Sequence, residues 1–243
     1  MRSGGHRRVP SDQVPLNWQN RKRTYAKILT VFRTYRLLEI QLSTETPQSV
    51  SPLPVEQWSP SLDNVKRDMN GNPINVHKLM ANNPELLQAW WNFRNYSVKG
   101  GSLGDRFGEL VILRVGIRLA AWYEWGSHVD RSLRCGLTLE EIDRVLEREI
   151  SDQWSEQEAS LLTAVDELLE NHCLSDSTRI GLSKSFSVPQ ILDIIAIHGM
   201  YVILGCMIKT WGLELDDAVN QRIREHTTPE TFAKAARLFH GPD

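Results

Sequence analysis

The feature that most constrains the fold is the spacing of apolar residues, which recur every three or four positions between recognisable helix-start signals. The run Leu161, Leu162, Val165, Leu168, Leu169 has the period of one face of a helix. Thr138 with Glu141, and Ser155 with Glu158, have the spacing of capping boxes. No segment alternates between apolar and polar residues with the period of a strand. The sequence therefore predicts an all-α protein.

Helix boundaries follow from caps, prolines and glycines. We expect helices from Pro84 to about Val98 with Asn83 as N-cap, from Asp105 through the apolar positions up to Ala120, around Glu124 and His128 up to Gly136, after Thr138, after Ser155, after Ser175, from Pro189 to about Thr210, and from Pro229. The longest apolar run, Ile191 to Ile208, is interrupted by Asp193 and His198. This run predicts a buried helix or an interface rather than a transmembrane span.

Charge divides the chain unevenly. Of 28 basic and 30 acidic residues, nine basic and two acidic ones fall within the first 42 positions, so this segment has a net charge of +7 and the remainder −9. We predict a basic N-terminal extension and linker over residues 1–50, and one helical domain over residues 51–243. The stretch from Ser43 to Pro60, rich in Ser, Thr and Pro, reads as a linker. The Arg-rich, acid-poor extension could be a mitochondrial transit peptide, a helix that docks on the domain or a poorly ordered tail.

Overall composition excludes several classes of function. A net charge of −2 gives no indication of binding to nucleic acid or to an anionic membrane. Three widely spaced cysteines, Cys135, Cys173 and Cys206, argue against a disulfide framework and against a cysteine-rich metal site. A reducing, cytoplasmic setting fits best, with the mitochondrion as the alternative.

Glu124 and His128 form the most suggestive constellation. They are four residues apart, so both side chains project from the same face of a helix. A carboxylate beside an imidazole is a proton-transfer pair, and the neighbouring aromatic residues Trp122, Tyr123 and Trp125 would surround it with a medium of low polarity. An ordinary ion pair on a helix surface has the same spacing, so the residues alone leave both readings open.

The stretch from Asp105 to Ile142 resembles the carboxymuconolactone decarboxylase and alkyl-hydroperoxidase-D superfamily. The shared motifs are Arg106, Glu109-Leu110 and Ile112-Leu113-Arg114-Val115, then Glu124-Trp125 with His128, then Gly136-Leu137-Thr138 and Glu140-Glu141-Ile142. Further motifs are Pro84-Glu85-Leu86 with Trp90 upstream, and Trp154-Ser155 and Gly199-x-Tyr201 downstream. The resemblance covers about residues 52 to 217.

The resemblance indicates the decarboxylase-type branch. The hydroperoxidase branch carries cysteines seven and four residues before the histidine, where this chain has Ala121 and Glu124. A thiol peroxidase needs an attacking and a resolving thiol, so this activity is not expected. The other branch has a glutamate at the position of Glu124 and another at that of Glu109. Close relatives often carry a further glutamate where this chain has Trp122, so the resemblance decides neither the substrate nor the reaction.

The resemblance implies a cofactor-independent lyase that decarboxylates a small or medium-sized activated acid, in aromatic catabolism or a biosynthetic pathway. In this reading His128 protonates the enolate left by CO2, Glu124 orients His128, and Glu109 completes a proton relay. Arg114 would bind the substrate carboxylate, or else form a salt bridge to Glu109 or to a neighbouring helix. The other expected pocket residues are Tyr123, Trp125, His198 and Tyr201, and His198 and Tyr201 could equally be core residues.

No metal or cofactor is expected, because two ligands on one helix are too few for a metal. The resemblance also implies a homo-oligomer, either a trimer or a hexamer. A dehydratase or isomerase using the same proton-transfer pair remains an alternative. A helical binding or assembly module without catalytic activity is a second alternative.

Overall fold

One buried helix, α5, organises the structure, a computed structural model that describes residues 48–97 and 101–240. Its elements in order are η1 (Val55–Gln57), η2 (Pro60–Leu62), α2 (Asp63–Asp68), α3 (Asn75–Met80), α4 (Pro84–Asn95), α5 (Asp105–Arg118), α6 (Trp122–Arg134), α7 (Leu139–Val145), α8 (Glu156–Asn171), α9 (Asp176–Ser183), α10 (Val188–Trp211), α11 (Asp217–Ile223) and α12 (Pro229–His240). These residues contain no strand. The all-α prediction is confirmed.

The predicted helix starts are confirmed at the level of individual caps. The Asn83 side chain accepts from the backbone N–H of Leu86, and Thr138 and Ser155 each complete a capping box with the glutamate three residues later. Each cap satisfies N–H groups that the first helical turn leaves unpaired. Gly136 adopts a φ of +87°, in the left-handed region that glycine tolerates, just beyond the end of α6.

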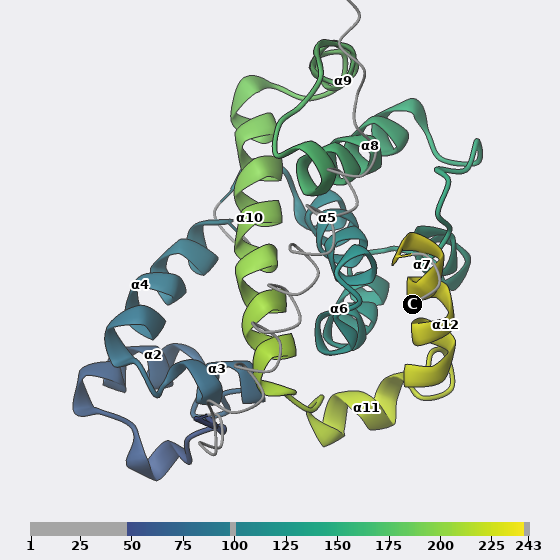
Figure 1. The fold of residues 1–243 in the computed structure, drawn as a ribbon. Helices are drawn as coiled ribbons and strands as arrows, with labels where there is room; N and C mark the ends of the chain where they lie inside the picture. Colours follow the sequence, from purple (N-terminus) through teal and green to yellow (C-terminus); the bar gives the residue numbers. More distant parts are fainter. Residues whose placement is uncertain (1–47, 98–100, 241–243) are drawn as a thin grey trace, which may run out of the picture. The chain divides into compact units, whose positions relative to one another are not determined.

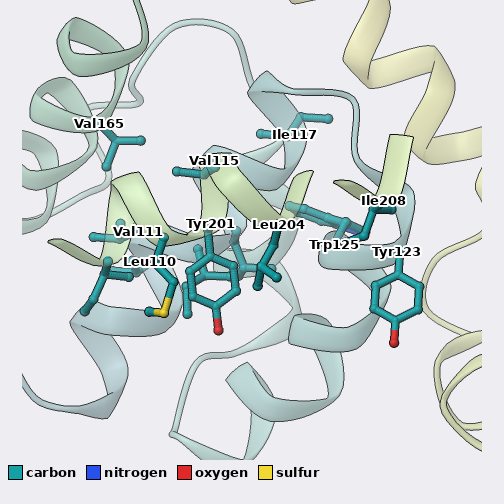
Figure 2. Close-up of a cluster of buried hydrophobic side chains, with 14 of the residues drawn as sticks. Leu110, Val111, Val115, Ile117, Tyr123, Trp125, Val165, Tyr201, Leu204 and Ile208 are labelled. Carbon is teal, nitrogen blue, oxygen red and sulfur yellow. The ribbon is translucent and has the colours of Figure 1, made fainter. Parts of the chain in front are cut away.

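Helix α5 lies at the centre of the fold because it is apolar on every side. All ten positions from Gly108 to Ile117 are buried, and α5 packs against α6, α8 and α10, with α7 and α12 also in contact (Figure 1). Figure 2 shows part of the resulting core, including Leu110, Val111 and Val115 of α5 together with Leu204 and Ile208 of α10. A helical stretch buried on every side must pair its polar residues internally, and the buried part of α5 carries two charged residues, Glu109 and Arg114.

Two features differ from the pattern read from the sequence. The apolar periodicity after Asp105 continues to Ala120, but α5 ends at Arg118 and the chain turns through Ala120, whose φ is +51°. The stretch read as a linker up to Pro60 is partly packed, since Trp58 is buried and its indole N–H donates to the Leu53 carbonyl at 3.0 Å. The basic segment, residues 1–42, lies outside the described residues.

Helix α10 is buried along one side and exposed along the other. Ile194, Ile197, Tyr201 and Leu204 belong to the core. On the exposed side lie the large apolar residues Val188, Leu192, Ile195, Ile203 and Trp211. By length and composition α10 could cross a membrane, and 44% of its most apolar window is buried inside the fold.

Candidate active site

Two consecutive helices bring a carboxylate and an imidazole together. Helices α5 and α6 are joined by a short turn and pack against each other along their length, and Gly116 lets the backbones approach closely: a Cβ there would lie 3.4 Å from the Trp125 nitrogen. This hairpin sets Glu109 opposite His128, nineteen residues away in sequence. The Nδ1 of His128 lies 2.7 Å from Oε2 of Glu109, and both side chains are buried.

The hydrogen bonds of His128 assign its proton. Arg131, one turn further along α6, donates from Nη1 to Nε2 of His128 over 3.2 Å. A guanidinium can only donate, so Nε2 must present a lone pair and the proton of neutral His128 must sit on Nδ1, where it is donated to Glu109. Ser132 makes a longer contact, 3.4 Å, from its hydroxyl to the same Glu109 oxygen.

Glu124 is a neighbour of the imidazole rather than its hydrogen-bond partner. Its Oε2 lies 3.9 Å from Nε2 of His128, beyond hydrogen-bonding distance, and its Oε1 is buried without a partner among the described residues. The resemblance implied that Glu124 orients His128 and that Glu109 completes a relay. The structure instead gives the orienting bond to Glu109 and leaves Glu124 on the other side of the ring.

Burial and neighbouring charges shift the pKa values of Glu124, His128 and Glu109 in different directions. Burial raises the pKa of Glu124 to about 8, even though the Arg131 charge acts in the opposite direction, so Glu124 is largely protonated at neutral pH. Burial also lowers the pKa of His128, and the Glu109 charge only partly opposes this, so the ring is neutral. Burial alone would raise the pKa of Glu109, but His128 and Arg131 hold it below its ordinary value.

Beside the imidazole lies a small cavity of about 20 Å³, just larger than one water molecule needs. Its walls come from α3, α4, α6 and α10. The lining residues are Ile74, Val76, His77, Trp90, Arg94, Tyr123, Glu124, Ser127, His128, Arg131, Tyr201 and Leu204. The Tyr201 ring stands edge-on to His128, with 5.0 Å between ring centres. Figure 2 shows Tyr201 and Tyr123 pointing their hydroxyls out of the apolar core on the same side.

Unpaired polar atoms concentrate at this cavity. Six buried side-chain nitrogen or oxygen atoms find no hydrogen-bond partner within the described part of the chain, and four of them belong to lining residues: His77 Nδ1, Trp90 Nε1, Glu124 Oε1 and Ser127 Oγ. Buried polar groups in folded proteins are almost always paired. Four exceptions around one hollow therefore mark a place where water or a ligand completes the structure.

Arg114 does not reach this cavity. Its guanidinium is buried and makes paired bonds to the Asp166 carboxylate, at 2.9 and 2.6 Å, and its remaining donors bind the carbonyls of Val145, Glu147 and Arg148. Of the alternatives left open by the sequence, the structure shows the salt bridge to a neighbouring helix, here α8, and not to Glu109. No donor of Arg114 is left for a substrate, so substrate binding is not its role.

The other expected pocket residues separate into two groups. Tyr201 and Tyr123 line the cavity, and the Tyr123 hydroxyl also donates to Asp216 over 2.7 Å. Trp125 does not line it: its ring packs on Phe232 and its indole N–H donates to Thr227. His198 also lies outside the lining, on α10. Of the cysteines, Cys173 and Cys206 are exposed and Cys135 caps α6, and none lines the cavity.

Sequence reasoning missed the cationic side of the cavity. Arg94 and Arg131 both line it, together with His77 and Ser127. Sequence spacing could have identified two of them, because Ser127 and Arg131 lie within one turn of His128 on the same helix. Arg94 and His77 belong to α4 and α3, and nothing in local spacing relates those helices to His128. Burial lowers the pKa of His77 to about 3, so that side chain is neutral.

Comparison with known proteins agrees with the predicted resemblance. The model of the carboxymuconolactone decarboxylase family matches residues 84–167, which span α4 to most of α8. The chain is similar to the debrominase Bmp8, solved as a cysteine-to-alanine variant with 2,3,4-tribromopyrrole, at 19% identity and a TM-score of 0.62, over 76% of this chain and 100% of that one.

A second solved structure, described as an alkylhydroperoxidase AhpD core and an uncharacterized peroxidase-related protein from Ralstonia eutropha JMP134, is 17% identical with a TM-score of 0.60 and covers 71% of this chain and 95% of its own. At these identities the likeness shows the fold. A search of curated proteins found no significant match. The family match over residues 84–167 and the shared fold both support the superfamily resemblance read from the sequence.

Proposed function

We propose that this chain, a member of the carboxymuconolactone decarboxylase superfamily, is an acid–base enzyme that acts on a small organic acid without a cofactor, with Glu124, His128 and Glu109 as its catalytic groups. One observation carries the proposal: two carboxyls flank one buried imidazole, Glu109 at 2.7 Å from Nδ1 and Glu124 at 3.9 Å from Nε2 of His128, and their surroundings shift the two pKa values in opposite directions. Titratable neighbours whose pKa values are driven apart are typical of acid–base catalysis.

The reaction we propose first is decarboxylation. The bond between the carboxylate carbon and the substrate carbon breaks, CO2 leaves, and the electron pair delocalises into a neighbouring carbonyl as an enolate. The Glu124 carboxyl then gives its proton to that carbon and regains one from water. Glu124 suits this step better than His128, because it is protonated at neutral pH whereas His128 is not.

A proton-transfer reaction, isomerisation or dehydration, is the second candidate, and the state of His128 favours it. The neutral imidazole has its lone pair on Nε2 and its other nitrogen bonded to an ionised glutamate. This arrangement orients a general base and stabilises the imidazolium that forms, as in carboxylate–histidine pairs of hydrolases. His128 would take a proton from a carbon next to a carbonyl, and Glu124 would deliver one elsewhere on the same substrate.

The test is a turnover screen of the full chain against β-keto, vinylogous and lactone acids, followed by NMR and mass spectrometry. Glu124→Gln and His128→Ala are compared with the wild type, and Glu140→Gln, an exposed glutamate on α7, is the matched control. Loss of CO2 that disappears with Glu124→Gln supports the lyase. A mass-neutral change or loss of water that disappears with both variants supports the second candidate. Turnover at the wild-type rate in folded His128→Ala and Glu124→Gln contradicts both.

We also propose that the chain assembles with copies of itself, as a trimer or hexamer, through the exposed side of α10. Leu192 is 61% exposed and Ile203 is 49% exposed, and such large apolar side chains along one face are typical of an interface. Light scattering of the purified chain tests this: a monomer at micromolar concentration would contradict it.

A further inference from the structure

The cavity beside His128 holds two arginines and too little opposite charge. Among the described residues Arg131 has a single side-chain hydrogen bond, to the neutral His128. Arg94 donates to the Asn95 amide oxygen over 3.2 Å and stacks on the Trp91 ring at 5.1 Å. Within the described ranges neither arginine forms a salt bridge, although other arginines of the fold do, such as Arg106 with Glu141 and Glu158. A cation held in a partly buried site is stabilised when a counter-charge accompanies it.

The unpaired polar atoms around the cavity are mostly donors. The Trp90 indole can only donate, the Ser127 hydroxyl can donate, and so can the protonated Glu124 carboxyl. Together with the two guanidinium groups, these donors surround the hollow from α4 and α6. The group that satisfies them must accept several hydrogen bonds at once and carry negative charge, which describes a carboxylate.

We propose that Arg94, Arg131, Trp90 and Ser127 form a subsite that binds the substrate's carboxylate, and that Arg131 leaves Nε2 of His128 for this carboxylate when the substrate binds. The inference rests on the function proposed above and extends it. In the structure the Arg131 guanidinium covers the Nε2 lone pair that a general base must use. Substrate binding exposes that lone pair, so the base becomes available only when an anion occupies the site.

The cavity is too small for a substrate, which fits a site that widens when the substrate binds. A volume of about 20 Å³ holds a water molecule but not a substrate, so at least one lining group must move. Arg131 is the group best able to do so, since it is half-buried and held in the cavity by one hydrogen bond. Trp90 and Glu124 are anchored by burial in the core.

The test is a titration of the full-length protein with acetate, and with acetamide as the neutral analogue, followed by NMR of the Trp90 indole N–H and of His128 Nε2. We expect saturable acetate binding, a change at Nε2 as the arginine leaves it, and no saturable binding of acetamide. Arg94→Gln and Arg131→Gln should each weaken acetate at least tenfold. Arg134→Gln, an exposed arginine on the same helix, is the matched control and should bind as the wild type.

Arg94→Lys and Arg131→Lys keep the charge, and they protect the test against glutamine variants that misfold. We expect them to retain most of the binding. Wild-type affinity in folded Arg94→Gln and Arg131→Gln, or acetamide binding as tightly as acetate, would overturn the proposal. An Nε2 signal that does not change at saturating acetate would refute the movement of Arg131.

The two proposals fail in different ways. His128→Ala should still bind acetate, because its ring is not part of the subsite, while losing any turnover. Acetate binding without turnover of any acid would leave the subsite standing and refute the enzyme. Turnover that is insensitive to Arg94→Gln and Arg131→Gln would leave the enzyme standing and refute the subsite.

Discussion

Replacing Arg114 by methionine separates the role that the resemblance implied from the one that the structure shows. A substrate-binding arginine would be needed for activity and dispensable for folding. In the structure Arg114 is 1% exposed, it pairs with Asp166, and it binds the carbonyls of Val145, Glu147 and Arg148. We therefore expect Arg114→Met to cost stability and to leave the cavity intact.

The magnitude follows from what the substitution leaves behind. Removing one partner of a buried ion pair costs about 3–5 kcal/mol, because the other partner stays desolvated and unpaired. Asp166 keeps 19% of its side chain exposed and has a second partner, Arg118, whose Nε lies 3.4 Å from its Oδ1, and both features favour the lower end of this range. At about 2–4 °C per kcal/mol for a chain of this size, a loss of about 3 kcal/mol lowers the Tm by about 6–12 °C.

The assay combines thermal and urea unfolding with the acetate titration. The matched control is Arg179→Met on α9, whose pair with Asp176 is exposed on both sides and should contribute at most about 1 kcal/mol. A folded Arg114→Met protein with wild-type stability and no acetate binding would refute this reasoning and restore Arg114 to the substrate site.

Four further predictions follow from the site and the surface. The pKa of Glu124 is raised to about 8, so the stability that its protonated form contributes is fully present below about pH 4.5 and is lost as the pH rises through 8. The free energy of unfolding in urea should therefore fall from pH 7 to 9 in the wild type and fall less in Glu124→Gln. An equal fall in both proteins would contradict this. Because the pKa of His77 is lowered to about 3, the free energy of unfolding should fall as the pH drops below 6.5. His77→Phe should weaken this pH dependence between pH 6.5 and 5. The same dependence of stability on pH in the variant and the wild type would count against the prediction. Replacing Cys135, Cys173 and Cys206 together by serine should leave turnover within about twofold, and its loss would revive thiol chemistry. Leu192→Glu should shift the oligomer towards monomer in light scattering without changing acetate binding, and an unchanged mass would exclude this face as the interface.

The sequence predicted the helices well where the signals are local. The caps at Asn83, Thr138 and Ser155 involve residues three apart, so one short stretch of chain contains the whole interaction. The break at Ala120 was missed because a non-glycine residue with positive φ leaves no mark in the apolar pattern. That break is needed to form the site, because it lets α6 fold back along α5 and brings His128 next to Glu109.

The membership of the site was predictable, but the roles of its residues were not. The resemblance identified Glu109, Glu124 and His128, and all three meet in the structure. Spacing favoured the pair at positions 124 and 128, which share a helix face, whereas the hydrogen bond joins positions 109 and 128 across two helices. Side chains four apart on a helix are neighbours, but neither must point at the other. Which of two neighbouring carboxyls bonds the ring depends on the helix crossing.

The division of labour between the two glutamates then follows from their partners. Glu109 is bonded to His128 and lies near the charge of Arg131, and these favour its ionised form despite burial. Oε1 of Glu124 has no hydrogen bond to any described residue, and the negative charge of Glu109 lies nearby, so burial dominates and Glu124 keeps its proton. An anion drawn to Arg131 would remove part of the positive field at Glu124 and raise its pKa further. The substrate would thereby reinforce the protonated state of the acid that we propose acts on it.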